Sequence, residues 1–150
     1  MKICVGGTFN NFHKGHKFIL NKAFEFAGKD GKIYIGLSTG DLVKNKKNTK
    51  PLEIRQKKLE DYLIEKGFNT QAIIVPIDNK FGLTLQKGFD AIVISPETEK
   101  TAIQINKERI LRGKKPLKII KVNYVLAEDG KPISSTRINN GEIDENGNIL

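Results

Sequence analysis

The chain has 150 residues and a formal net charge of +9, from 26 lysines and arginines against 17 aspartates and glutamates. This length fits one domain spanning residues 1–150, and the single cysteine excludes an internal disulfide. No apolar run approaches the ~20 residues that cross a bilayer. We therefore expect no membrane partner, no signal peptide and a cytoplasmic location. The positive charge fits nucleic acid, a lysine-rich solvated surface or a small polyanionic substrate.

Short apolar runs and helical periodicities alternate along the chain, and glycines follow several of the periodic stretches. The predicted strands span residues 2–5, 32–37, 72–75, 91–94 and part of 117–127; the predicted helices span 18–27, 53–66, 98–112 and a short segment from Ser134 or Ser135. This alternation predicts an α/β fold, a Rossmann-like doubly wound parallel five-stranded sheet. The polar and acidic residues 141–150 are expected to form a peripheral tail.

The stretch Gly6–His16, with the sequence GGTFNNFHKGH, joins the first predicted strand to the first predicted helix and holds both histidines. Ligands of open α/β sheets bind off the carboxyl ends of strands, and the N-terminus of a helix offers free N–H groups to a phosphate. Each histidine could instead be a helix cap or a packed side chain. Two histidines and Cys4 are too few ligands for a closed zinc site, so no protein-bound metal is predicted.

The pattern G-T-F-x-x-x-H-x-G-H resembles the signature of the HxGH nucleotidyltransferase superfamily, and Ile133–Ile138 resembles its I-S-S-T-x-[IV] element. The segment Ser95–Thr98, the pair Asn106 and Arg109, and Glu128–Gly130 are similar to the archaeal phosphopantetheine adenylyltransferases. The resemblance covers essentially the whole chain. It implies transfer of AMP from ATP to 4′-phosphopantetheine in coenzyme A biosynthesis, with Mg²⁺ carried by the triphosphate and no nucleic acid partner.

The resemblance also implies that Thr8, His13 and His16 contact the triphosphate, in a nucleotide-binding turn that includes Gly7 and Phe9. The attacking phosphate is already an anion, so the reaction needs positioning and charge stabilisation in place of a general base. We therefore expect both histidines to be catalytic hydrogen-bond donors to the α-phosphoryl oxygens.

The remaining candidates lie in three later segments. Lys44 and Lys46, in a basic loop after the second strand, are catalytic candidates for charge neutralisation, although such a loop can be a merely solvated surface. Arg109 is a candidate nucleotide-binding residue that could equally complement its helix dipole. In the last segment an arginine in the first helical turn indicates a nearby anion. The candidate ligands of the β- and γ-phosphates are therefore Ser134, Ser135, Thr136 and Arg137, and Arg137 is also a catalytic candidate.

Other functions remain open at this point. The same chemistry with another acceptor would give an FAD synthetase, a nicotinamide-nucleotide adenylyltransferase or a glycerol-phosphate cytidylyltransferase. Cytidylyltransferases typically carry R-T-x-G-I-S-T-T before the last helix, whereas residues 128–136 read EDGKPISST. A basic nucleotide- or RNA-binding module without turnover is a further alternative. Superfamily members usually carry Asp where this chain has Asn10, so any role of that carboxylate is in doubt here.

Overall fold

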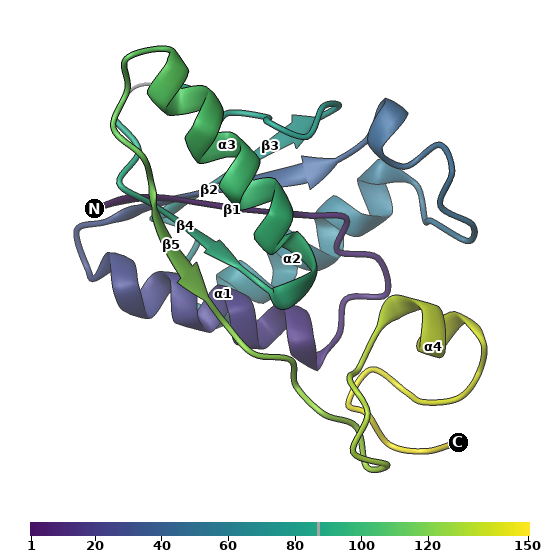
Figure 1. Cartoon of the computed structure of the whole chain (residues 1–150). Helices are drawn as coiled ribbons and strands as arrows, with labels where there is room; N and C mark the ends of the chain where they lie inside the picture. Colours follow the sequence, from purple (N-terminus) through teal and green to yellow (C-terminus); the bar gives the residue numbers. More distant parts are fainter. Residues whose placement is uncertain (87) are drawn as a thin grey trace.

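The computed structural model describes residues 1–86 and 88–150 and shows one sheet with helices on its two faces (Figure 1). The strands are β1 (Lys2–Gly7), β2 (Lys32–Ser38), β3 (Ala72–Ile77), β4 (Ala91–Ile94) and β5 (Lys118–Lys121). The helices are α1 (Lys14–Ala27), α2 (Leu52–Lys66), α3 (Glu99–Leu111) and α4 (Ser135–Asn139), with the single 3₁₀ turns η1 (Gly40–Leu42) and η2 (Pro96–Thr98).

The strand order is β3-β2-β1-β4-β5, and all neighbouring strands are parallel. In the centre of the sheet Val5 pairs with Ile35 on one side and Val93 on the other. The predicted Rossmann-like parallel five-stranded sheet is confirmed. The chain order reverses between β1 and β4, and ligands of such sheets bind at this switch point, beyond the carboxyl ends of the strands.

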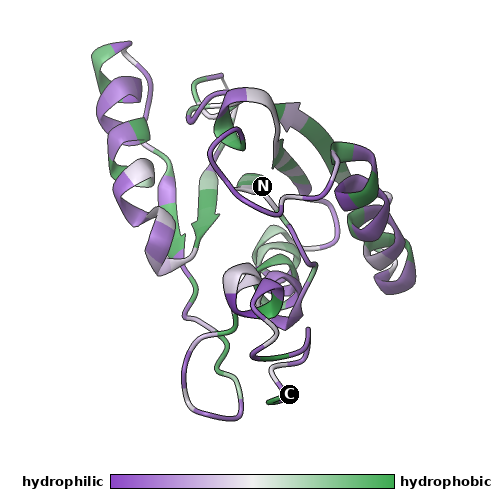
Figure 2. Ribbon diagram, turned by 90° about the vertical axis from the view of Figure 1, so that its right-hand side faces the viewer, coloured by the Kyte–Doolittle hydropathy of each residue, from purple (hydrophilic) through white to green (hydrophobic). Residues whose placement is uncertain are grey.

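Alternate residues of each strand point to opposite faces, which gives the sheet two separate cores. On β1, Ile3 and Val5 face the larger core with α1 and α2, whereas Cys4 faces a smaller core with α3. In Figure 2 the strands are mostly green and the helices carry purple turns on their outer sides. Burial on both faces explains why the run at Ala91–Ile94 is apolar throughout.

The long helices end at or next to the glycines that the sequence analysis marked. Gly28 ends α1 and Gly67 ends α2, both with φ near +73°, a conformation that costs glycine little. Gly113 has the same φ and follows Arg112, the C-cap residue of α3. The sequence therefore determines these boundaries locally.

Residues 141–150 differ from the expected peripheral tail. The segment lies beside α4, to one side of the sheet (Figure 1), and Ile143 is fully buried in a third cluster with Ala127 and Ile133. The backbone N–H of Lys14 at the start of α1 donates to Glu145 O at 2.9 Å. The tail is thus part of the packing that holds α4 near α1. Within the described residues no helix is long and apolar enough to span a bilayer.

Candidate active site

The loop from Thr8 to His13 leaves the carboxyl end of β1 and enters α1 at the edge of the sheet where ligands bind. Phe9 has φ 51° and Asn11 has φ 49°, so the loop makes two left-handed steps with non-glycine residues. The Phe9 ring is buried, and a Cβ added to Gly7 would lie 3.2 Å from it. Gly7 therefore makes room for an aromatic side chain, which the sequence analysis had counted only as part of the nucleotide-binding turn.

His13 and His16 cap α1 for each other. His13 Nδ1 accepts the backbone N–H of Gly15 at 3.0 Å and of His16 at 3.4 Å, while His16 Nδ1 accepts the backbone N–H of His13 at 3.1 Å. The two rings stack with their centroids 3.7 Å apart. This is a capping box built from two imidazoles in place of Ser/Thr and Glu/Gln.

The cap fixes the protonation of both rings. A backbone N–H always carries its proton, so each Nδ1 is the bare acceptor and each neutral ring carries its proton on Nε2. No buried side-chain nitrogen or oxygen of the described residues lacks a hydrogen-bond partner. The two Nε2–H groups make no bond within the described part of the chain, and each therefore keeps some contact with solvent.

Burial also keeps the rings neutral. It lowers the pKa of His13 to about 4, and burial together with the neighbouring His13 ring lowers the pKa of His16 well below its usual value. Both side chains therefore remain uncharged donors at neutral pH. The alternatives of helix cap and catalytic donor are compatible here, because the cap uses Nδ1 and leaves Nε2 free.

The glycine between the histidines has a steric reason. A Cβ at Gly15 would lie 2.9 Å from His13 Cε1 and 3.0 Å from His13 Nδ1, closer than real Cβ contacts. Any other residue at this position would push the His13 ring away from the N–H groups that it caps. The H-x-G-H spacing is thus a requirement of the cap itself.

The basic loop, defined as residues 44–50, places its two candidate lysines differently. Lys46 Nζ donates to Thr8 Oγ1 at 2.7 Å, which brings an ammonium group to the loop after β1. Lys44 is 62% exposed and its Nζ lies 3.8 Å from Asp41 Oδ1. The structure brings Lys46 to Thr8 and leaves Lys44 in an exposed ion pair with Asp41.

Arg55, which was not among the predicted site residues, links the basic loop to the loop after β1. It is 3% exposed and lies in the first turn of α2. Its guanidinium donates to Ser38 O at 2.7 Å, to Lys50 O at 2.7 Å and to Thr8 O at 3.0 Å. Burial lowers its pKa. The only sequence signal for this role was an arginine in a chain that otherwise uses lysine.

The hydroxyl residues at the start of α4 face the same loop. Ser134 caps α4, since its Oγ accepts the backbone N–H of Arg137 at 3.2 Å. Ser135 Oγ accepts the side-chain amides of Asn10 at 3.1 Å and Asn11 at 3.0 Å. These contacts join two signature elements that lie 125 residues apart in sequence. Thr136 is exposed.

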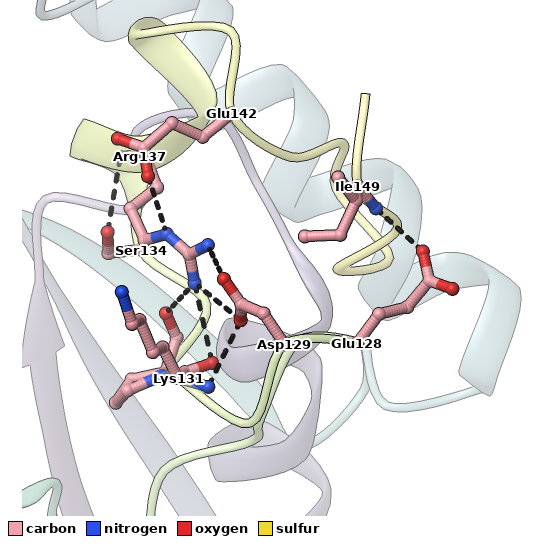
Figure 3. Close-up of polar contacts among 8 residues, drawn as sticks. Glu128, Asp129, Lys131, Ser134, Arg137, Glu142 and Ile149 are labelled. Atoms are coloured by element: carbon pink, nitrogen blue, oxygen red, sulfur yellow. Dashed lines mark hydrogen bonds and ion pairs between the residues drawn. The ribbon is translucent and has the colours of Figure 1, made fainter.

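Arg137 is engaged elsewhere (Figure 3). Its guanidinium pairs with the carboxylate of Asp129 and, through Nε at 3.1 Å, with Glu142, while Nη1 donates to Pro132 O at 3.1 Å. These carboxylates raise the pKa of Arg137, and Arg137 lowers that of Asp129. A contact with phosphate would require these ion pairs to open, so the structure favours a role in holding the C-terminal segment.

Arg109 is not brought to the site, contrary to the sequence prediction. It lies ten residues after the start of α3, about 15 Å along the helix from the carboxyl edge of the sheet. Its guanidinium is buried and donates to Thr84 O at 2.6 Å, Gln86 O at 3.0 Å and Lys115 O at 2.7 Å. Asn106, one turn earlier, exchanges two hydrogen bonds with the backbone of Leu117. Both residues brace the α3–β5 connection.

Acidic ligands are scarce at this edge. Among residues 1–86 and 88–150 no three histidines, cysteines, aspartates or glutamates gather closely enough to hold a metal ion. Asn10 offers an uncharged amide, which forms hydrogen bonds with Asn48, Lys50 and Ser135. The described side chains therefore supply donors and positive charge at the site.

Comparisons with known proteins agree with this geometry. A family model described as "Cytidylyltransferase-like" matches residues 4–141. A phosphopantetheine adenylyltransferase of Methanosarcina mazei is 43% identical over 149 residues, which cover 99% of this chain and 96% of that protein. The protein of the same name from Archaeoglobus fulgidus is 41% identical over 152 residues and is covered completely, as is this chain.

Solved structures give the same picture. A crystal structure of an Archaeoglobus fulgidus protein of unknown function superposes with a TM-score of 0.73 at 36% identity, over 81% of this chain and 89% of that one. A tyrosyl-tRNA synthetase from the same organism shares the fold alone, with a TM-score of 0.66 at 11% identity, over 91% of this chain and 59% of that one. The family model and the full-length relatives show that this chain belongs to the cytidylyltransferase-like family and, within it, to the phosphopantetheine adenylyltransferases.

Proposed function

We propose that this chain transfers AMP from ATP to 4′-phosphopantetheine, giving dephospho-CoA and pyrophosphate, with His13 and His16 as the catalytic donors. The observation that carries the proposal is the double use of the two imidazoles. Their Nδ1 atoms cap α1, and their Nε2–H groups make no hydrogen bond within residues 1–86 and 88–150, at the edge of the sheet where substrates bind. The full-length relatives named phosphopantetheine adenylyltransferase support the choice of substrates.

The chemistry suits neutral donors. The attacking phosphate oxygen is already anionic, so the enzyme must align two polyanions and stabilise the charge that grows on the α-phosphoryl oxygens. A neutral Nε2–H donates to such an oxygen without taking the proton that a base would remove. The low pKa of His13, about 4, keeps it in this form at working pH.

Cationic and hydroxyl groups would complete the triphosphate site. Lys46 already contacts Thr8, which starts the loop that leads to the histidines, and charge neutralisation by Lys46 would strengthen as pyrophosphate leaves. Ser134, Ser135 and the exposed Thr136 are the proposed ligands of the β- and γ-phosphates. Mg²⁺ would arrive as part of the MgATP substrate, since Mg²⁺ at such sites is held largely by phosphates and water.

The choice of 4′-phosphopantetheine as acceptor is supported by the relatives and not by a contact within this chain. Asn106 and Arg109 donate their hydrogen bonds to the backbone carbonyls of Leu117 and Thr84. The test is pyrophosphate release with ATP or CTP across a panel of phosphorylated acceptors. We expect 4′-phosphopantetheine with ATP to give the highest kcat/KM. Equal or faster turnover with nicotinamide mononucleotide, FMN or glycerol 3-phosphate, or with CTP, would contradict the proposal.

A further inference from the structure

The carboxyl end of the basic loop, residues 44–50, is held through both backbone polar groups of Lys50. The backbone N–H of Lys50 donates to Asn10 Oδ1 at 2.9 Å, and Lys50 O accepts Arg55 Nε at 2.7 Å. Two residues earlier Asn48 has φ 59°, a left-handed conformation that asparagine tolerates better than most residues. The loop is therefore anchored at this end, while its lysine side chains are exposed.

Asn10 is the residue that links this anchor to the rest of the site. Its Nδ2 donates to Asn48 O at 3.0 Å and to Ser135 Oγ at 3.1 Å, while its Oδ1 receives Lys50 N–H. The side chain is 6% exposed. It thus ties the basic loop on one side and α4 on the other to the loop after β1.

This set of partners requires an amide. Of the side chains of this size, only asparagine accepts from a backbone N–H through one terminal atom and donates to a carbonyl through the other. An aspartate would keep the bond from Lys50 N–H but would place a second oxygen 3.0 Å from Asn48 O, where no proton lies between them. The amide of Asn10 therefore makes a set of bonds that a carboxylate at this position would not make.

We infer that Asn10 is a positioning residue, whose amide anchors the basic loop so that Lys46 lies beside Thr8. Its effect on turnover rests on the proposed function, whereas the anchoring of the loop does not. Lys46 is four residues before Lys50, so a fixed Lys50 restricts where the Lys46 ammonium can reach. Loss of the anchor would leave Lys46 chemically intact but less often in place.

The neighbouring Asn11 is a matched control. It has the same side chain, is 7% exposed and also donates to Ser135 Oγ, at 3.0 Å. Its other amide contacts are Ser135 O and Asn139 Oδ1, both in α4. Asn11→Asp therefore damages the contact with α4 and leaves the two bonds to the basic loop intact.

The first measurement needs no substrate. Limited trypsin digestion reports loop opening at Lys44, Lys46 and Lys47, with thermal unfolding by circular dichroism to choose conditions where each variant stays folded. We expect Asn10→Asp to raise the rate of cleavage in the loop by roughly tenfold or more, since the Asn48 carbonyl loses its donor and meets a carboxylate oxygen instead, and Asn11→Asp to change it less than twofold. If Asn10→Asp does not fold, Asn10→Ala, which removes the bonds without adding charge, takes its place. Unchanged cleavage, or equal acceleration in the Asn10 and Asn11 variants, overturns the anchoring role.

The second measurement asks whether Asn10 acts through Lys46. We expect Asn10→Asp to lower kcat roughly tenfold in the parent and less than twofold in a Lys46→Ala background, with most of the loss in kcat rather than KM. Equal losses in both backgrounds would overturn the positioning role. A parent with no adenylyl transfer to any acceptor would refute the proposed function and with it this catalytic effect, while the digestion result would still decide whether Asn10 anchors the loop.

Discussion

The first turns of α1 and α4 have the same plan and use it differently. In each, the N-cap side chain accepts the backbone N–H three residues later, from His13 to His16 in α1 and from Ser134 to Arg137 in α4. In α1 the later side chain turns back and caps the first, whereas in α4 it turns away to Asp129 and Glu142. The two histidines thereby keep their Nε2–H groups unpaired within the described residues, whereas most N–H groups of Arg137 donate to oxygens of the protein.

The difference shows that the partners of a polar side chain decide its function more than its type does. An arginine in the first turn of a helix is disfavoured by the helix dipole, and here two carboxylates offset this. A neutral imidazole meets no such penalty and can remain unpaired at Nε2. The less charged of the two turns is therefore the better candidate for catalysis, and four experiments test this contrast.

The largest effect is expected for His16. Removing a donor aimed at developing charge costs about 10²–10³ in kcat, so His16→Ala should lose this factor while ATP affinity changes much less. His16→Gln is the matched control, because a glutamine at this position can restore the capping box. We expect it to keep the parent melting temperature and still lose most of the turnover. Near-normal kcat in His16→Gln would show that α1 needs His16 only as a cap.

The next effect concerns pH and His13. Its pKa is about 4 in the folded chain and 6.5 without the fold, so between these values the unfolded chain binds more protons. The stability that this residue contributes is present above pH 6.5 and is lost as the pH falls toward 4, by about 3 kcal/mol. Denaturant unfolding of the parent and of His13→Asn, a cap that does not titrate, measures the difference. Identical pH profiles would contradict the buried neutral ring.

A smaller effect separates the two lysines. Lys46→Ala should lower kcat roughly tenfold, less than His16→Ala, because solvent screens the charge of the exposed ammonium. Lys44→Ala removes the same charge from the same loop but only loses an exposed pair with Asp41, so it should change kcat less than twofold. Steady-state kinetics with saturating acceptor measure both. Equal losses would mean that the loop acts only through its total charge.

The last prediction concerns Arg137, whose loss should affect stability more than turnover. Arg137→Gln should lower the melting temperature, because Asp129 and Glu142 lose their common partner, and should leave kcat within a few-fold of the parent. Asp129→Asn, which breaks the same ion pair from the other side, is the comparison variant. If Arg137→Gln lost as much turnover as His16→Ala while Asp129→Asn did not, Arg137 would be a phosphate ligand and the contrast between the two helices would fail.

The sequence by itself determined the local features of this protein. Strand 91–94 was recognisable because it is apolar on both faces. The ends of α1 and α2 were recognisable because each is followed by a glycine, which adopts a positive φ at little cost. The H-x-G-H cap was also within reach, since every partner lies within three residues. Such features depend on near neighbours, which a sequence pattern displays directly.

Only the tertiary structure decided which distant groups meet. Arg109 looked like a ligand until folding placed it against the carbonyls of Thr84 and Gln86, and the acidic tail looked peripheral until Ile143 was found buried. Asn10 meets Ser135 across 125 residues. The physical reason is that the partner of a buried polar group is set by which segments the core brings together, and a strong signal for the group itself does not identify that partner.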